Sequence, residues 1–256
     1  SSPQVWFAHA AVTTPEAHFS TERFARGGIG QAGVTVEPFL AWIDEWKLEG
    51  PDMNSLSVQA ASPDFAFDMD LLATGPLVFH GENGFSQKSA EGQASYYYSQ
   101  PFYKISGTLN LPEGDISVTG SAWLDREWSS QPLSDSQKGW DWFSLSFEDG
   151  EKMMGFQLRQ SDGNHYTSAT WIDVNGETQS YPDGAFMAEP IEEARVAGRD
   201  IPIRWRVRLS DRGLDAEVLA LMPKAWMDVS IPYWEGPVGI SGSHNGRGYL
   251  EMTGYQ

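Results

Sequence analysis

The stretch of sequence best suited to chemistry is "AWLDREW", residues 122–128, in which acids alternate with aromatic rings. In an extended strand alternate side chains point to opposite faces, so Trp123, Asp125 and Glu127 should share one face. A carboxyl group among indole rings is poorly solvated as an anion, and its pKa rises. Such a group can keep its proton near neutral pH and act as a general acid. We therefore take Asp125 as a candidate proton donor, with Glu127 as its acidic neighbour.

The same residues also allow a purely structural interpretation. Asp125 or Glu127 can pair with Arg126 or with another arginine and fix the end of the strand. The two interpretations predict different surroundings for Asp125. A general acid must border an open cavity, whereas a structural acid should lie against a guanidinium group.

Aromatic residues elsewhere in the chain are candidates for the wall of a wide pocket. The sequence contains 11 Trp, 13 Phe and 9 Tyr, an excess that suits a large site lined by rings. The stretch "SYYYS", residues 95–99, should send Tyr96 and Tyr98 to one side of a strand and Tyr97 to the other. The candidates for substrate binding are Trp6, Tyr98, Trp123, Trp140 and Trp142.

Period-2 alternation dominates the chain and predicts half-buried antiparallel strands, as in "FAFDMDL" and "IPIRWRVRL". Three turn pairs, Asp149-Gly150, Asp162-Gly163 and Asn175-Gly176, each separate two strand-like stretches and predict a meander. Helical patterns are scarce, although residues 184–197 are expected to hold a turn of helix limited by Pro190. Many short strands with frequent turns favour an all-β barrel or sandwich.

A weak internal repeat predicts two β units. Residues 105–128 and 240–255 both contain Ile-Ser-Gly, a turn, and then an aromatic residue, Leu and an acid. The repeat matches Trp123-Leu124-Asp125 with Tyr249-Leu250-Glu251. The polar stretch 129–139, which contains Pro132, has the composition of a linker. We therefore expect an N-terminal domain over 1–130 and a C-terminal domain over 131–256.

Composition narrows the classes of partner and chemistry. Seventeen basic against 35 acidic residues give a net charge of −18, a field that repels nucleic acid, so no nucleic-acid partner is expected. The absence of cysteine excludes disulfides and a thiol nucleophile. No apolar run of about 18 residues exists to span a membrane. No metal-ligand spacing, nucleophile elbow or P-loop occurs, so nothing in the sequence indicates a metal or cofactor.

Several stretches together resemble the AttH/CrtC family of lipocalin-like proteins. The matching stretches are "FAHAAVT", "WIDEWKL", "SYYYSQP", "VTGSAWLDREWSSQ", "GWDWFSLSFEDGEKMMGFQLR", "IPIRWRVRL" and "YWEGPVGISG", which run in order over nearly the whole chain. This family includes carotenoid 1,2-hydratases, and many members carry the label "predicted secreted hydrolase". The resemblance implies two lipocalin-like (calycin) antiparallel β-barrel domains side by side.

The resemblance also implies a function. The hydratases transfer a proton to a carbon–carbon double bond of an isoprenoid, and water then captures the cation. Their proposed proton donor corresponds to Asp125, and Trp123 takes the place of an aromatic residue thought to line that site. A histidine is also implicated in those enzymes, and His9 in "WFAHAAV" is the candidate counterpart; from the residues alone, His9 is expected to be a hydrogen-bonded core histidine.

This chain departs from the hydratases at two points. It carries Arg126 and Glu127 where they have histidine- and asparagine-type residues, which resembles the AttH-like branch, whose members often accompany ABC-type exporters. Two functions therefore stay open: a hydratase or hydrolase acting on a large hydrophobic ligand, and a non-catalytic periplasmic carrier or chaperone for a lipid. Relatives also begin with further strands, including a "WWY" stretch, that are absent here, so the first barrel is expected to be incomplete unless those strands were cleaved.

The resemblance implies a secreted or periplasmic protein. The opening stretch "SSPQVWFAHAAV" has neither a basic nor an apolar signal region. We therefore expect that any signal peptide is missing from this chain.

Overall fold

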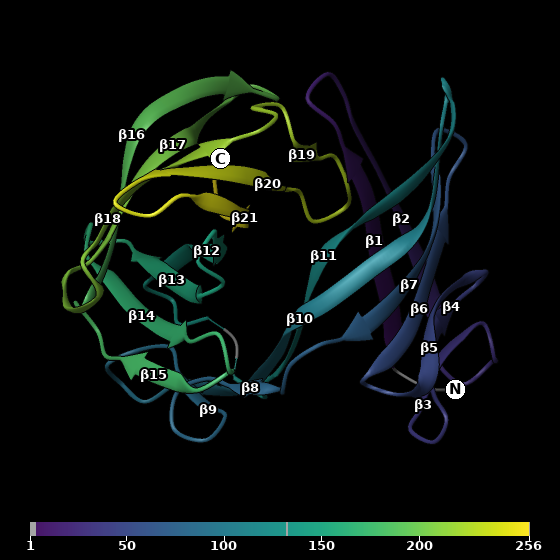
Figure 1. The fold of residues 1–256 in the computed structure, drawn as a ribbon, viewed down its shortest axis with the longest axis horizontal. Helices are drawn as coiled ribbons and strands as arrows, with labels where there is room; N and C mark the ends of the chain where they lie inside the picture. Colours follow the sequence, from purple (N-terminus) through teal and green to yellow (C-terminus); the bar gives the residue numbers. More distant parts are fainter. Residues whose placement is uncertain (1–3, 132, 256) are drawn as a thin grey trace.

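Antiparallel strands make up nearly the whole computed structural model, which describes residues 4–131 and 133–255 (Figure 1). Within those ranges a single-turn 3-10 helix, Ser210–Arg212, is the only helical element. The all-β prediction is confirmed. None of the helical segments in the described chain is long and apolar enough to cross a membrane.

The N-terminal half consists of a hairpin and a large curled sheet. The hairpin, β1 (Val5–Thr13) and β2 (His18–Arg26), forms a sheet of its own. The large sheet has the strand order β11-β10-β7-β6-β5-β4-β3, and the short strands β8 and β9 also pair with β10. Its strands are β3 (Ala32–Thr35), β4 (Phe39–Ile43), β5 (Trp46–Asp52), β6 (Ser55–Ala61), β7 (Ala66–Ala73), β8 (Val78–Phe79), β9 (Phe85–Gln87), β10 (Ala94–Leu111) and β11 (Gly114–Trp128).

The hairpin β1–β2 packs onto the large sheet through apolar side chains. Ala10, Val12 and Ala25 of the hairpin form one buried cluster with Ile43 and Trp46 of the sheet. Removal of this apolar area from water holds the hairpin in place without a shared hydrogen-bond ladder.

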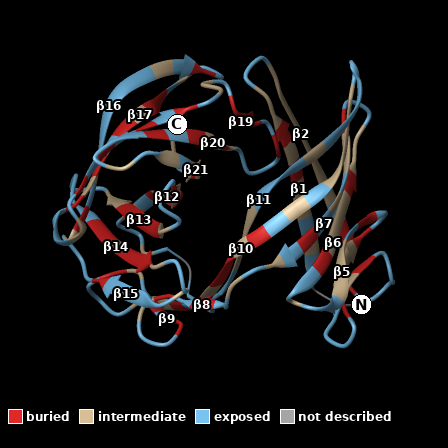
Figure 2. Ribbon diagram, viewed as in Figure 1, coloured by how far each residue is buried: buried red, intermediate tan, exposed pale blue. Residues whose placement is uncertain are grey.

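The C-terminal half is a second curled sheet, ordered β15-β14-β13-β12-β21-β20-β18-β17-β16, with β19 paired to β20. Its strands are β12 (Gln137–Phe147), β13 (Lys152–Gln160), β14 (His165–Ile172), β15 (Thr178–Tyr181), β16 (Phe186–Val196), β17 (Arg199–Leu209), β18 (Leu214–Ala220), β19 (Trp226–Met227), β20 (Tyr233–Gly242) and β21 (Gly246–Met252). Phe143, Trp171, Trp205 and Trp234 lie in its core. Figure 2 shows buried residues concentrated in β13 and β14.

The predicted meander is confirmed, because β12, β13, β14 and β15 pair consecutively. Gly150, Gly163 and Gly176 in the three turns have φ of 95°, 87° and 89°, a left-handed conformation that glycine adopts without steric cost. The helical turn expected within 184–197 is wrong, because these residues form β16. Pro190 is tolerated there since β16 lies at the edge of its sheet, where the missing N–H breaks no central ladder.

Strand β10 connects the two halves. It is 18 residues long, and a register shift between Gln100 and Tyr103 divides it. The part before the shift pairs with β8 and β9, and the part after it pairs with β7. Its Tyr97 belongs to a buried cluster with Phe156 and Leu158 of β13, so the two halves share a core.

The two large sheets divide the chain between Trp128, where β11 ends, and Gln137, where β12 begins. Pro132 of the expected linker lies outside the described residues. The domain ranges 1–130 and 131–256 stay a prediction.

Candidate functional site

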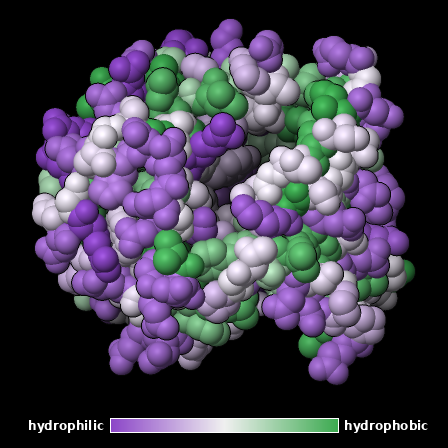
Figure 3. All heavy atoms as spheres, in the orientation of Figure 1, coloured by the Kyte–Doolittle hydropathy of each residue, from purple (hydrophilic) through white to green (hydrophobic). Residues whose placement is uncertain are grey.

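A cavity of about 1440 Å³ lies between the two halves, and Figure 3 shows the molecule hollowed there. Strands β10 and β11 form one wall, and β12, β13, β20 and β21 form the other. Pockets for drug-sized ligands commonly span about 300–1,000 Å³, so this cavity suits a large ligand. The rings that line it belong to Tyr97, Trp123, Trp128, Trp140, Trp142, Phe147, Phe156 and Tyr249.

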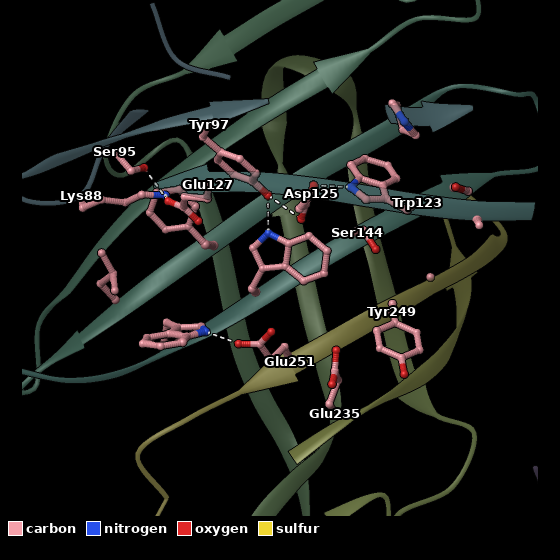
Figure 4. Close-up of a pocket in the computed structure, with 18 of the residues that line it drawn as sticks. Lys88, Ser95, Tyr97, Trp123, Asp125, Glu127, Ser144, Glu235, Tyr249 and Glu251 are labelled. Atoms are coloured by element: carbon pink, nitrogen blue, oxygen red, sulfur yellow. Dashed lines mark hydrogen bonds and ion pairs between the residues drawn. The ribbon is translucent and has the colours of Figure 1, made fainter. Parts of the chain in front are cut away.

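Asp125 lies in the β11 wall of this cavity, beside Tyr97 and Trp123 (Figure 4), and accepts three hydrogen bonds. The Tyr97 hydroxyl donates to Oδ2 at 2.8 Å, the Trp123 indole donates to Oδ1 at 2.7 Å, and the Ser99 hydroxyl also donates to Oδ1. Burial raises the pKa of Asp125, and the hydrogen bonds from Ser99, Trp123 and Tyr97 oppose that rise. Within the described residues no arginine or lysine pairs with Asp125, so the guanidinium clamp of the structural interpretation is absent there.

His80 and Ser99 lie behind Asp125, and both are fully buried. The His80 Nε2 atom is 2.7 Å from Ser99 Oγ. Burial, helped by the positive charge of Lys88, lowers the pKa of His80 to about 3, so the ring is neutral near pH 7. Sequence spacing predicts neither residue, because strand pairing across the sheet brings them to Asp125.

Tyr97 connects Asp125 to the C-terminal half. The Trp142 indole donates to the Tyr97 hydroxyl at 2.9 Å, and Tyr97 in turn donates to Asp125. The neighbouring Tyr98 does not line the cavity; its ring lies against Phe79 and Trp128. The predicted alternation in "SYYYS" holds, but the face that meets the cavity is that of Tyr97.

Glu127 also lines the cavity and forms an ion pair there. The Lys88 Nζ atom lies 2.7 Å from its Oε1, and the Ser95 hydroxyl donates to the same oxygen. The ammonium of Lys88 also stands over the ring of Phe156, 4.1 Å from its centroid. The structural interpretation therefore describes Glu127 well, with a lysine as the partner in place of an arginine.

His9 and Trp6 lie outside the cavity, on β1. His9 Nδ1 is 3.0 Å from the Tyr233 hydroxyl, and its Nε2 is 3.9 Å from Glu22. Trp6 packs against the hairpin cluster. Both residues are separated from Asp125 because the hairpin covers a different part of the sheet. Trp123, Trp140 and Trp142, in contrast, all line the cavity as expected.

A second group of polar residues lies on the opposite wall. Glu235 of β20 and Glu251 of β21 are direct cross-strand partners, and both line the cavity with Tyr249. The Trp140 indole donates to Glu251 at 2.6 Å. Burial raises the pKa of Glu251, and burial together with the Glu251 charge raises that of Glu235 to about 7. The internal repeat in the sequence could have identified this group, because it matches Glu251 with Asp125 and Tyr249 with Trp123.

The described residues include no group of three His, Cys, Asp or Glu side chains arranged to hold a metal ion. The site is thus a cavity walled by rings, with one carboxyl centre on β11 and a second on β20 and β21.

Two curled antiparallel sheets with a cavity between them define an all-β protein of the lipocalin-like class. The sequence model of a family described as AttH-like matches residues 1–255, and the chain belongs to this family. A solved structure of an AttH protein from Nitrosomonas europaea is 32% identical, with a TM-score of 0.90 over 98% of this chain and 82% of that one. Kievitone hydratase from Nectria haematococca is 19% identical, with a TM-score of 0.77 over 98% of this chain and 81% of its own. No curated protein matches the chain.

Proposed function

We propose that this protein binds a large isoprenoid- or lipid-like ligand in its cavity and adds water across a carbon–carbon double bond of that ligand. The observation that carries the proposal is the position of Asp125 in a ring-lined cavity, where no described lysine or arginine forms an ion pair with it and Lys88 acts on it only through its charge. Asp125 is the general acid. Association with an exporter and an extracytoplasmic location, which the family resemblance implies, belong to the same proposal.

The reaction begins with protonated Asp125. Its O–H bond breaks as the alkene π electrons form a new C–H bond, leaving a carbocation and an Asp125 carboxylate. The faces of Trp123 and Trp142 stabilise positive charge in the cavity by about 0.5–2 kcal/mol each. A water oxygen then forms a C–O bond to the cation and loses a proton, which yields an alcohol.

The fold gives limited support to this chemistry. Kievitone hydratase shares the architecture, and its name states that it hydrates kievitone. At 19% identity this likeness extends to the fold alone, and fold does not determine function. Support for a hydration therefore comes from the geometry at Asp125.

One observation favours a second candidate, a non-catalytic lipid carrier. Three donors converge on the Asp125 carboxyl, and hydrogen bonds of this kind stabilise the anion, which has no proton to give. In a carrier Asp125 would hold Tyr97 and Trp123 in place to shape the cavity.

The two candidates differ in what happens to an added alkene. We propose incubating the purified protein with farnesol in water enriched in heavy oxygen, followed by extraction and mass spectrometry. A hydratase adds to farnesol a second hydroxyl group that contains the heavy oxygen. Asp125→Asn lowers the formation of this product by about a hundredfold or more, the scale of general acid catalysis. Farnesol that is bound but recovered unaltered supports the carrier.

The matched control is Glu113→Gln, a change at an exposed acid in the turn between β10 and β11. It should hydrate farnesol as the wild type does. Full activity in Asp125→Asn, with folding verified by circular dichroism, would contradict the role of Asp125.

A further inference from the structure

The wall opposite Asp125 carries two carboxyl groups that face each other. Glu235 and Glu251 pair directly across β20 and β21, and such cross-strand neighbours have Cβ atoms about 5 Å apart on one face of a sheet. No lysine or arginine forms an ion pair with either group in the described chain. Two carboxylates this close repel each other in a poorly solvated site, so one of them tends to keep a proton.

The surrounding groups make the two carboxyls unequal. The Trp140 indole donates to Glu251 at 2.6 Å, which favours the ionised form of that residue. The negative charge of Glu251 and burial together raise the pKa of Glu235 to about 7. A hydrogen bond from Tyr233 opposes that rise, and near neutral pH Glu235 is therefore partly protonated.

A free hydroxyl group next to the pair indicates a place for a polar ligand. Tyr249 precedes Glu251 by two residues on β21, lines the cavity, and lies beside Glu235 and Glu251 in Figure 4. Its hydroxyl has no hydrogen-bond partner among the residues that the structure describes. Tyr249 is half-buried in the cavity wall, so its hydroxyl is available to a bound water or to an oxygen of the ligand.

The two carboxyl centres belong to different halves of the molecule. Asp125 extends from β11, and the pair extends from β20 and β21, with the cavity between them (Figure 4). The charge on Asp125 acts on Glu251 electrostatically, which shows that the centres are near enough to influence each other. A ligand lying between them would meet the Asp125 proton on one side and the pair on the other.

We propose that Glu235 and Glu251 form a second catalytic centre, in which Glu251 takes the proton of the water that captures the cation while Tyr249 positions that water. This inference rests on the proposed hydration and extends it. The water oxygen forms the C–O bond, its O–H bond breaks, and the proton goes to the Glu251 carboxylate. Asp125 ends the cycle ionised and the pair ends it with one proton more, and exchange with solvent in the cavity restores both.

The proposal predicts that protonation of the alkene and capture of the cation by water can be measured separately. The measurement uses farnesol as the probe in heavy water. If Asp125 transfers a deuteron to farnesol and the cation then loses a proton, the recovered farnesol contains deuterium on carbon. If water captures the cation instead, the product is hydrated, deuterated farnesol. Glu251→Gln should lower alcohol formation by about tenfold or more, while deuterium still enters the recovered alkene. Tyr249→Phe should also lower the ratio of hydrated farnesol to recovered deuterated farnesol.

Three further results decide the outcome. Asp125→Asn should lose both products, and the exposed-site control Glu113→Gln should keep the wild-type ratio. An unchanged ratio in folded Glu251→Gln and in Tyr249→Phe overturns the inference while leaving the hydration intact. If the wild-type protein gives neither product, the proposed function itself fails and the inference falls with it.

Discussion

At the scale of single residues, the hydroxyl group of Ser99 links His80 to Asp125, because it has one hydrogen atom and both groups can accept it. Ser99 has one hydroxyl hydrogen and two neighbours, His80 Nε2 and Asp125 Oδ1. If Ser99 donates to Asp125, His80 must carry its proton on Nε2 and Asp125 can be ionised. If Ser99 donates to His80, Asp125 must supply a proton of its own to Ser99. The tautomer of a buried neutral histidine is thereby coupled to the protonation of the candidate acid.

Ser99→Ala tests this coupling through the pH dependence of hydration. Donation from Ser99 opposes the rise in the Asp125 pKa that burial causes, so removing the hydroxyl raises that pKa further. Activity requires protonated Asp125 and declines as pH rises through its pKa. The declining limb of the pH–rate profile for farnesol hydration should therefore move to higher pH in Ser99→Ala.

Ser117→Ala, at an exposed position on β11, serves as the control and should leave the profile unchanged. A limb that stays in place in Ser99→Ala, or moves to lower pH, would contradict the account of Ser99 as a donor to Asp125.

At the scale of strands, the acidic pair depends on close packing between β21 and β12. A Cβ atom on Gly248 of β21 would lie 2.3 Å from the carbonyl oxygen of Ser144 and 2.8 Å from a methyl group of Leu145. The carbonyl belongs to the backbone of β12 and cannot rotate away. The absence of a side chain at Gly248 lets β21 approach β12 and hold Tyr249 and Glu251 at the cavity.

Gly248→Ala should therefore destabilise the protein by about 1–3 kcal/mol, the usual cost of overpacking. The measurement is the free energy of unfolding in urea. Gly239→Ala is the matched control, because Gly239 of β20 pairs with Arg247 in the adjacent strand and a Cβ atom there meets nothing within 4 Å. Equal losses of stability in the two variants would show that the contact with Ser144 is unimportant.

Strand periodicity also explains which features the sequence could predict. The alternation in "AWLDREW" placed Trp123, Asp125 and Glu127 on one face because β11 is regular there, and all three line the cavity. Turn pairs identified the meander because glycine at positive φ is a local requirement. The helical turn within 184–197 was wrong because local composition there does not reveal that Pro190 lies in an edge strand.

The missing parts of the site depend on which strands become neighbours. His80 reaches Asp125 through Ser99 because Ser99 pairs with both Val78 and Asp125 on the two sides of β10. Glu235 meets Glu251 through the register of β20 and β21. Residue spacing gives the alternation within one strand but not the register between two paired strands, so these contacts could not be derived from the chain alone.

At the scale of the whole molecule, buried acids oppose the usual effect of pH on an acidic protein. Surface carboxyls such as Glu22 and Asp215 have pKa values lowered by hydrogen bonds and ion pairs, so their contributions to stability are lost as pH falls. The cavity carboxyls of Asp125, Glu235 and Glu251 have raised pKa values. The folded chain binds their protons more tightly than the unfolded chain does, and their contributions are lost as pH rises.

Glu235 allows this opposing effect to be measured. Its pKa of about 7 in the folded protein exceeds the ordinary 4.5, so its contribution to stability is fully present below pH 4.5 and declines until the pH passes 7. By proton linkage the decline is on the order of 3 kcal/mol. Glutamine resembles the protonated acid and does not titrate. Glu235→Gln should therefore match the wild type in free energy of unfolding at pH 4.5 and exceed it at pH 8, whereas Glu113→Gln should show no such divergence. If the difference between Glu235→Gln and wild type were the same at both pH values, Glu235 would not be a buried acid sharing its site with a second negative charge.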